Sequence, residues 1–250
     1  MTTVHEWWKW TGAAQVTVVC IPWAGAGAAP FSSWADRFPA DVDLCALRLP
    51  GREARFAEEP VADLGRLVTL LADEVEALEL PAFALFGHCF GGLVAFELAR
   101  EFVRRGRARP TRLLVASQPA PRLSGVSEAE QAEDMWDRVR RAGQIPPAVI
   151  ESAEMRAVLG PAIAADLAIS DRYAYESGPA LDLPIVVIGG SEDGTLTSAR
   201  LAAWEQETTG PFAFRLFEAD HFFRDGGWPV LADAVAAAAT ADPAVLAASS

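Results

Sequence analysis

The stretch AFALFGHCFGGLVAFELAR, residues 82–100, joins a short apolar segment to an amphipathic one through a glycine-containing turn. Residues 82–87 are apolar or small without interruption, which is typical of a buried strand. The residues after the turn place apolar side chains at helical spacing. Gly87 and Gly91 flank Cys89 at the two positions where a side chain would collide in a sharp strand-to-helix turn. The pattern Gly-x-Ser-x-Gly marks a nucleophile held on such a turn, and here a cysteine stands in place of the serine.

Similar apolar runs recur along the chain and alternate with helical patterns. Besides residues 82–87, the candidate strands are VTVVCI (16–21), LCALRL (44–49), RLLVAS (112–117), IVVIGG (185–190) and FAFRLF (212–217). Several are continuously apolar, as in a parallel sheet that is covered on both faces. Residues 62–78 and 93–105 have the spacing of amphipathic helices. The alternation predicts an α/β fold with a mostly parallel central sheet and helices on both faces.

One long interval breaks this alternation. Residues 119–184 contain no convincing strand, only helical segments interrupted by proline and glycine. Long excursions in compact domains are usually functional, so we predict a helical lid inserted into the fold. The alternative is an extra structural subdomain without a gating role. At 250 residues the chain has the size of one large α/β domain, and we expect residues 1–250 to form a single domain with this insertion.

Composition and charge exclude several classes of function. A formal net charge of −13 argues against nucleic-acid binding and against binding to an anionic membrane surface. Hydrophobic residues make up 51% of the chain and charged residues 22%, which excludes global disorder. The chain does not open on a basic segment followed by an apolar one, and no apolar run reaches membrane-spanning length. We therefore expect a cytoplasmic protein.

The chain contains three cysteines and three histidines. Cys20 and Cys45 lie in apolar, strand-like runs, where buried free thiols are common. Three cysteines far apart in sequence indicate no disulfide framework. The histidines show no metal-ligand spacing, so we expect neither a metal nor a bound cofactor.

A nucleophile at Cys89 needs a base, and that base needs an orienting acid. His5 lies in a segment that we expect to be a flexible terminus. His88 lies within the turn itself, where it cannot fold back onto its neighbour. This leaves His221, directly after the last candidate strand, as the predicted base.

The acid is expected between nucleophile and base in chain order, at the end of the preceding strand. The segment IVVIGGSEDGTL (185–196) supplies Glu192 and Asp193 at that place. We favour Asp193, with Glu192 as the alternative. The resulting order of Cys89, Asp193 and His221 is the nucleophile–acid–base order of α/β-hydrolases.

Acyl chemistry also requires N–H groups that stabilise an oxyanion. One donor would be the backbone N–H of Phe90, the residue after the nucleophile. The second would come from the loop CIPWAGAGAAPF (20–31), whose small residues let a substrate carbonyl approach the backbone near Ala24. Without Cys89 and His221 this loop would be interpreted only as a glycine-rich turn.

Several segments together resemble those of type II thioesterases, the stand-alone editing enzymes that accompany modular polyketide and nonribosomal peptide synthases. IPWAGAGAAPFSSWA (21–35) resembles the family's phenylalanine–proline–x–alanine–glycine–glycine segment, and LRLPGREARFAEEP (47–60) resembles its proline–glycine–arginine segment. FGHCFGGLVAFELAR (86–100) resembles its nucleophile turn, while IGGSEDGTL (188–196) and DHFF (220–223) resemble its acid and histidine segments. The resemblance covers nearly the whole chain. Cys89 replaces the usual serine, and Trp23 occupies a position where histidine is frequent.

This resemblance implies an α/β-hydrolase fold, a lid at the insertion and thioesterase activity through an acyl-enzyme intermediate. It implies a triad of Cys89, His221 and Asp193, with oxyanion amides at Ala24 and Phe90. The substrate would be an acyl thioester on the phosphopantetheine arm of an acyl or peptidyl carrier protein, with no other cofactor. No nucleic acid or membrane partner is expected, and we expect a monomer.

Sulfur at position 89 leaves other functions open. An acyl-cysteine is itself a thioester and stays reactive toward amines and thiols, so an acyltransferase or cyclase of the same fold is one alternative. A carrier-protein binding module without catalysis is another, although it would not need an intact triad. A hydrolase like dienelactone hydrolase also uses such a cysteine, but the lid and the LPGR segment fit it poorly. Replacement of a native serine by cysteine would leave the same sequence.

Carrier proteins in these systems are acidic, so a chain of charge −13 would dock one through a local basic patch. Two arginine clusters are candidates: Arg104, Arg105, Arg107, Arg109 and Arg112 form one, and Arg138, Arg140 and Arg141 form the other. Arg52 and Arg55 are further candidates. Each set is equally compatible with ordinary solvated helix ends.

Overall fold

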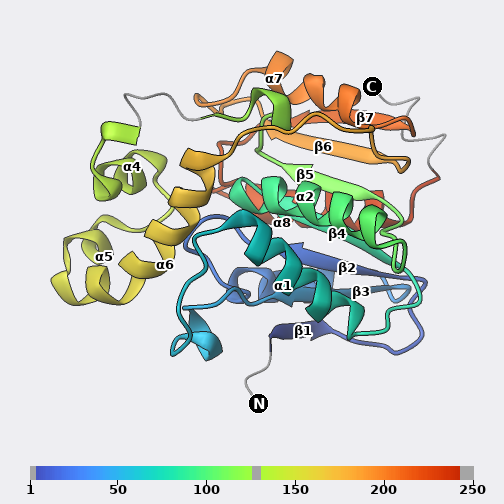
Figure 1. Ribbon diagram of the computed structural model, residues 1–250, viewed down its shortest axis with the longest axis horizontal. Helices are drawn as coiled ribbons and strands as arrows, with labels where there is room; N and C mark the ends of the chain where they lie inside the picture. The colour runs from blue at the N-terminus through green and yellow to red at the C-terminus, as the bar shows by residue number, and fades with distance from the viewer. Residues whose placement is uncertain (1–3, 126–130, 243–250) are drawn as a thin grey trace.

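A seven-stranded sheet organises the chain, in the order β1-β3-β2-β4-β5-β6-β7 (Figure 1). The structure, a computed structural model, describes residues 4–125 and 131–242. The strands are β1 (His5–Lys9), β2 (Val16–Ile21), β3 (Val42–Leu47), β4 (Phe83–His88), β5 (Leu113–Ala116), β6 (Ile185–Gly190) and β7 (Phe212–Phe217). The helices are α1 (Leu64–Glu76), α2 (Phe90–Arg105), α4 (Met135–Ala142), α5 (Pro147–Glu151), α6 (Ala153–Arg172), α7 (Ser198–Ala202) and α8 (Gly227–Thr240). Short 3-10 helices are η1 (Ala29–Arg37), η2 (Glu53–Arg55), η3 (Pro121–Leu123) and η4 (Ala203–Glu207).

All six predicted strands are present, and β2 to β7 pair in parallel with their neighbours. The mostly parallel sheet is thus confirmed. The seventh strand, β1, was not predicted: it pairs antiparallel with β3, with His5 opposite Leu47. The expectation that His5 lies in a flexible terminus is therefore wrong. The strand is anchored beyond the sheet as well, because the indole N–H of Trp8 donates to Ala28 O at 3.1 Å.

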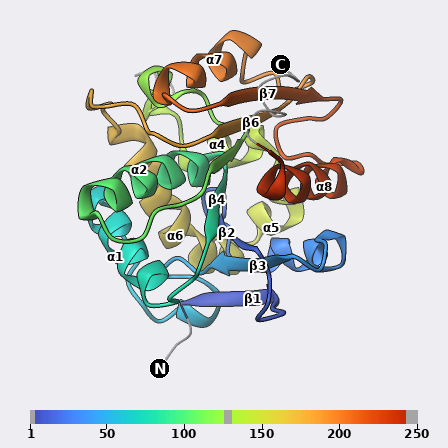
Figure 2. The ribbon, with the colours of Figure 1, turned by 90° about the vertical axis from the view of Figure 1, so that its right-hand side faces the viewer.

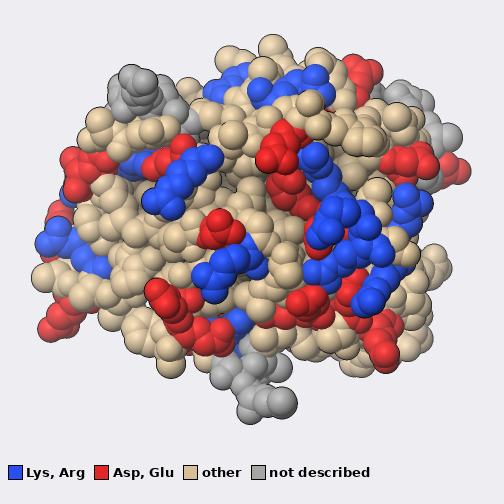
Figure 3. Space-filling view, viewed as in Figure 1, with Lys and Arg blue, Asp and Glu red and all other residues tan. Residues whose placement is uncertain are grey.

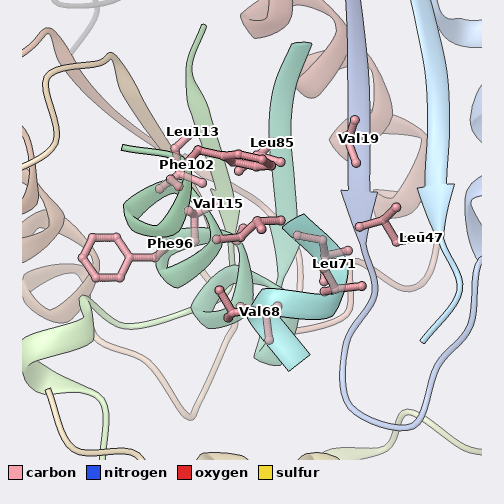
Figure 4. Packing of buried hydrophobic residues seen from close by; sticks show 14 of the residues in the cluster. Val19, Leu47, Val68, Leu71, Leu85, Phe96, Phe102, Leu113 and Val115 are labelled. Carbon is pink, nitrogen blue, oxygen red and sulfur yellow. The ribbon is translucent and has the colours of Figure 1, made fainter. Parts of the chain in front are cut away.

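The sheet is covered on both faces, as predicted. Alternate residues of each strand point to opposite sides, so neighbours such as Leu85 and Phe86 belong to different hydrophobic clusters. On one side α1 and α2 pack against the sheet, and on the other side lie η1 and α8 (Figure 2). Figure 4 shows the first cluster, where Val68 and Leu71 of α1 and Phe96 of α2 meet the strands.

Local signals explain where α1 and α2 begin and end. The side chain of Asp63 accepts a hydrogen bond from Arg66 N at 2.8 Å and so caps the start of α1. Helix α2 begins at Phe90, earlier than the predicted range 93–105, because the glycine-containing turn leads directly into it. It ends at Gly106, whose φ of 66° suits the left-handed conformation of a C-terminal cap.

The predicted helical insertion separates β5 from β6 and consists of η3, α4, α5 and α6 in the described residues. It has a small hydrophobic cluster of its own, in which Val139, Ile150 and Ile163 are buried. Figure 1 shows the insertion beyond one end of the sheet, beside the start of α2. Among residues 4–125 and 131–242, no helix is both long enough and apolar enough to cross a membrane.

Candidate active site

Cys89 lies on a strained turn between β4 and α2, with φ 52° and ψ −123°. A positive φ is unusual for a residue other than glycine and is expected of a nucleophile on such a turn. A Cβ atom at Gly87 would lie 2.0 Å from Gly91 O, and one at Gly91 would lie 2.2 Å from Ile21 O. The expected collisions at both glycines are thus confirmed. Cys89 N–H donates to Ala116 O at 2.8 Å, which ties the turn to β5.

The loops that follow β6 and β7 bring Asp193 and His221 together. His221 Nδ1 lies 2.7 Å from Asp193 Oδ2. Gly190 permits this approach, because a Cβ atom there would lie 2.2 Å from Ala219 O in the histidine loop. Asp193 is 6% exposed, whereas Glu192, the alternative acid, is exposed on the surface. The geometry therefore pairs His221 with Asp193.

Charge links these two residues to the nucleophile. Burial alone would lower the pKa of His221, but the negative charge at Cys89 and the hydrogen bonds to Asp193 and Cys89 raise it to about 10. Burial would raise the pKa of Asp193, yet the hydrogen bond and the charge of His221 bring it below its usual range. The site can therefore hold His221 as an imidazolium beside the carboxylate of Asp193. The nucleophilic form of a cysteine is the thiolate.

Thr195 belongs to the site although the sequence analysis did not single it out. Its backbone N–H and its hydroxyl both donate to Asp193 Oδ1, at 2.9 and 2.6 Å. Since Oδ2 faces His221, the two oxygens of the carboxylate are held in fixed roles. An aspartate that hydrogen-bonds the backbone two residues later is a common turn, so the pair Asp193 and Thr195 was a signal available in the sequence.

His88 supports the histidine loop. Its Nε2 lies 2.9 Å from His221 O, and its ring is buried among the aromatic rings of Trp23, Phe222 and Trp228. Burial, together with the charge of His221, lowers the pKa of His88 to about 3. The ring is therefore neutral, and its Nε2–H donates to the carbonyl of His221. Trp23, at a position where type II thioesterases often have histidine, is one of the aromatic rings that surround His88.

The predicted oxyanion residues lie on two adjoining segments. Phe90 is the first residue of α2, and Ala24 lies in the loop between β2 and η1, residues 22–28, which we call the oxyanion loop. This loop starts against the nucleophile turn, since a Cβ atom at Gly91 would lie within 2.6 Å of Pro22 O. Phe90 thus follows Cys89 directly in the chain, and Ala24 lies two residues after the part of the loop that approaches the turn.

The arginines at the far end of α2 are mostly neutralised by acidic neighbours. Arg104 and Arg105 both form ion pairs with Glu101, at 2.6 and 2.7 Å, and Arg105 also pairs with Asp73. Figure 3 shows this mixture of basic and acidic side chains over the C-terminal end of α2. Arg112 is buried and donates to backbone carbonyls of α8 and its end, so its prediction as a docking residue is wrong.

Arg52 and Arg55 are buried as well. Arg52 is 6% exposed and pairs with Asp166 of α6, while Arg55 is 3% exposed and pairs with Glu58 and Glu74. Neither guanidinium can contact a protein partner, so these docking candidates are also excluded.

In the insertion, Arg138 forms a two-pronged pair with Asp171. Arg140 and Arg141 are exposed and pair with acidic residues of the insertion. These two therefore remain accessible basic groups on the insertion.

A groove of about 840 Å³ lies between α1, α2 and the segment after α6. Leu64, Val68, Arg100 and Tyr173 are among its lining residues, and none of the predicted catalytic residues is.

Within the described ranges, no group of three or more histidine, cysteine, aspartate or glutamate residues could hold a metal ion.

Comparisons with known proteins show the family to which the chain is similar. The profile of the thioesterase domain family matches residues 16–237. The chain is 33% identical over 232 residues to the gramicidin S biosynthesis protein GrsT of Aneurinibacillus migulanus, covering 89% of this chain and 91% of that protein. It is 28% identical to the thioesterase PikA5 of Streptomyces venezuelae, covering 86% of this chain and 78% of the relative.

Solved structures show the same similarity. RedJ, a thioesterase from the prodiginine biosynthetic pathway in Streptomyces coelicolor, superposes with a TM-score of 0.83 at 32% identity, covering 90% of this chain and 86% of that one. YbtT, a type II thioesterase from the yersiniabactin NRPS/PKS pathway, gives a TM-score of 0.78 at 27% identity, with 93% and 94% covered.

Proposed function

The chain belongs to the thioesterase domain family, and on that premise we propose that it releases acyl groups from the phosphopantetheine arms of carrier proteins in polyketide or nonribosomal peptide biosynthesis. Membership makes it a thioester hydrolase. The similarity to a type II thioesterase of an NRPS/PKS pathway supports the class of substrate. The observation that carries the mechanism is the contact of His221 with Asp193, at 2.7 Å, beside a turn that holds Cys89 with φ 52°.

In the acylation step, the thiolate of Cys89 adds to the carbonyl carbon of the acyl thioester. The carbonyl oxygen becomes an oxyanion, which the backbone N–H groups of Ala24 and Phe90 stabilise. The intermediate then collapses: the bond between the acyl carbon and the sulfur of the arm breaks. That sulfur leaves with the proton of the His221 imidazolium, and the acyl group remains on Cys89.

In the deacylation step, His221 acts as a base. It takes a proton from a water molecule while the hydroxide adds to the acyl carbon of acyl-Cys89. Collapse of the second oxyanion releases the carboxylic acid and returns Cys89 to a thiolate. His221 keeps its proton, so the ion pair of the resting site is restored. Asp193 stabilises the imidazolium and fixes its ring orientation throughout.

Intact-protein mass spectrometry after mixing with a carrier-bound acyl thioester tests this function. We expect one acyl group per chain, on Cys89. Cys20 and Cys45 are fully buried, and burial raises the pKa of both thiols, so neither competes as a nucleophile. Cys89→Ala should lose acylation and turnover, and His221→Ala should lower turnover by about 10³-fold or more. Near-normal turnover in Cys89→Ala would overturn the proposal.

Acyl transfer is the second candidate, and the sulfur at position 89 is the observation that favours it. An acyl-cysteine keeps the reactivity of a thioester, whereas an acyl-serine is a less reactive oxygen ester. With an added amine, the wild type should therefore form more amide relative to acid than Cys89→Ser does. Equal ratios in the two proteins would remove the basis for transfer, and free acid alone from both would leave hydrolysis as the function.

The carrier protein should dock on the side of the insertion. Helix α2 has 16 residues, so its basic C-terminal end lies about 24 Å from the nucleophile turn. Among the exposed arginines of the insertion, we assign Arg140 and Arg141 to an acidic carrier. Changing both to glutamate should raise KM for the carrier-bound substrate and leave KM for a carrier-free acyl thioester unchanged, whereas Arg104→Glu should affect neither. The opposite pattern would move docking to α2.

A further inference from the structure

The peptide group between Ala24 and Gly25 is fixed at both ends by side chains of the insertion. Gln144 Nε2 donates to Ala24 O at 3.2 Å, and Gly25 N–H donates to Asp166 Oδ2 at 2.7 Å. These partners lie 120 and 141 residues away in the sequence. Both belong to the segment between β5 and β6, and neither belongs to the sheet that carries Cys89 and His221.

Asp166 is itself held rigidly. It lies on α6 and is 1% exposed. Its oxygens accept two hydrogen bonds from the guanidinium of Arg52, at 2.6 and 3.0 Å, and Oδ2 is shared with Gly25. Arg52 also donates to Ala26 O in the oxyanion loop, at 3.2 Å. A charged pair buried this deeply adds little to stability in general, but it fixes geometry strongly, because either partner alone would be an uncompensated charge.

Helix α6 also touches the loop directly. Gly25 has φ +76°, and a Cβ atom there would lie 2.5 Å from Ile163 Cγ1 of α6. The oxyanion loop therefore packs against α6 so closely that no side chain larger than that of glycine fits at position 25. Any displacement of α6 would remove this support together with the hydrogen bond from Gly25.

The orientation of this one peptide group matters for catalysis. With the carbonyl of Ala24 held by Gln144 and the N–H of Gly25 held by Asp166, the Gly25 amide is not available to substrate. The preceding peptide group, between Trp23 and Ala24, carries the N–H of Ala24. The direction of this N–H relative to the fixed peptide depends on the φ and ψ angles of Ala24. The insertion thus fixes the peptide group that follows the Ala24 N–H, while the peptide that carries this N–H is also held within the loop, where Trp23 O accepts a hydrogen bond from Ala26 N–H at 3.0 Å.

We propose that Asp166 and Gln144 are positioning residues that hold the oxyanion amide of Ala24, so that the insertion must be docked for the site to stabilise an oxyanion. The inference rests on the acyl-enzyme mechanism proposed above. It assigns Arg52, a residue of the segment that resembles the family's proline–glycine–arginine pattern, the role of holding Asp166 in place.

Two reactions of the same sulfur separate this role from a general structural one. Acylation of Cys89 by a thioester develops an oxyanion, whereas alkylation by iodoacetamide displaces iodide from a CH₂ group and develops none. Both need the thiolate. We expect Asp166→Asn to slow acylation between about 10-fold and about 1,000-fold, the larger figure being the cost of losing an oxyanion donor. Its rate of alkylation should match that of the wild type, and KM should change little.

Gln144→Met provides a second variant that leaves the buried ion pair intact. It removes one donor at a half-buried position and should slow acylation about 3–10-fold, a smaller loss consistent with one neutral hydrogen bond. Asp171→Asn is the matched control: Asp171 also lies on α6 and pairs through two hydrogen bonds with Arg138, a residue of the insertion and not of the oxyanion loop. It should acylate at the wild-type rate.

The outcomes are distinguishable. Acylation at wild-type rates in both Asp166→Asn and Gln144→Met would overturn the positioning role while leaving the acyl-enzyme mechanism intact. Equal losses of acylation and alkylation in both variants would also overturn it, because they would indicate damage to the thiolate or the fold. If the wild type itself were alkylated but never acylated at Cys89, the proposed function would fail instead.

Discussion

Replacing Cys89 by alanine should lower the pKa of His221 by about 1–3 units, the usual effect of an opposite charge within about 4–6 Å. In the intact site that pKa is raised to about 10. Burial acts in the opposite direction, and the negative charge at Cys89 is the largest effect that overcomes it, ahead of the hydrogen bond to Asp193. The variant loses both the charge and the hydrogen bond of the sulfur, so His221 should titrate between about 7 and 9.

NMR titration of the histidine rings measures this directly, because the chain has only three histidines. Burial lowers the pKa of His88 to about 3, and burial together with Arg48 lowers that of His5 below 6.5. Any ring that titrates in the alkaline range is therefore His221. Cys45→Ala serves as the control, since this buried thiol lies in β3 and should leave the alkaline titration unchanged.

Two results would contradict the reasoning. A wild-type His221 that titrates at or below 6.5 would mean that no thiolate–imidazolium pair forms. If the pKa of His221 stays near 10 in Cys89→Ala, Asp193 alone raises it. The charge at position 89 would then contribute nothing to the pKa of the base.

Three further predictions follow from neighbouring features. Asp193→Asn should lower turnover by about 10⁴-fold, whereas Glu192→Gln, on the exposed neighbour, should change it little; steady-state kinetics would reveal the reverse pattern if the acid were misplaced. Gly91→Ala should reduce both stability and alkylation of the thiol, because its Cβ atom would meet Ile21 O at 2.2 Å, and a variant with wild-type Tm would refute this. Burial raises the pKa of Glu74 to about 7, and its Oε2 is buried without a partner among residues 4–125 and 131–242. The stability that its protonated form contributes is therefore present below pH 4.5 and is lost as the pH rises through about 7. Glu74→Gln should flatten the pH dependence of the free energy of unfolding in that window; an unchanged slope in denaturant titrations would argue that the carboxyl stays ionised.

The features that could be predicted from sequence are those fixed by local chemistry. The turn at Cys89 depends on Gly87 and Gly91, which lie within two residues of it, so a short pattern was sufficient. Strand β4, which leads into the turn, is buried at every position and is apolar up to Gly87. Asp193 and Glu192 are adjacent at the end of one strand, and only the fold distinguishes the buried one from the exposed one.

The features that were missed depend on contacts distant in sequence. Strand β1 exists because it pairs with β3 about 40 residues later, and its HEWWK sequence alone does not indicate an apolar run. The arginines were misjudged for the same reason. Arg52 and Arg112 look like exposed cations in sequence, but their partners, Asp166 and the carbonyl of Ala238, are 114 and 126 residues away.

The two halves of the catalytic machinery are therefore supported differently. Cys89, Asp193 and His221 follow β4, β6 and β7, and the contacts between them involve no residue of the insertion. The oxyanion loop depends on that insertion through Gln144 and Asp166. If α6 moves away, the thiolate and its imidazolium persist while the oxyanion amide loses its orientation. A displaced insertion would then leave a sulfur that alkylating reagents still attack but that turns over thioesters slowly.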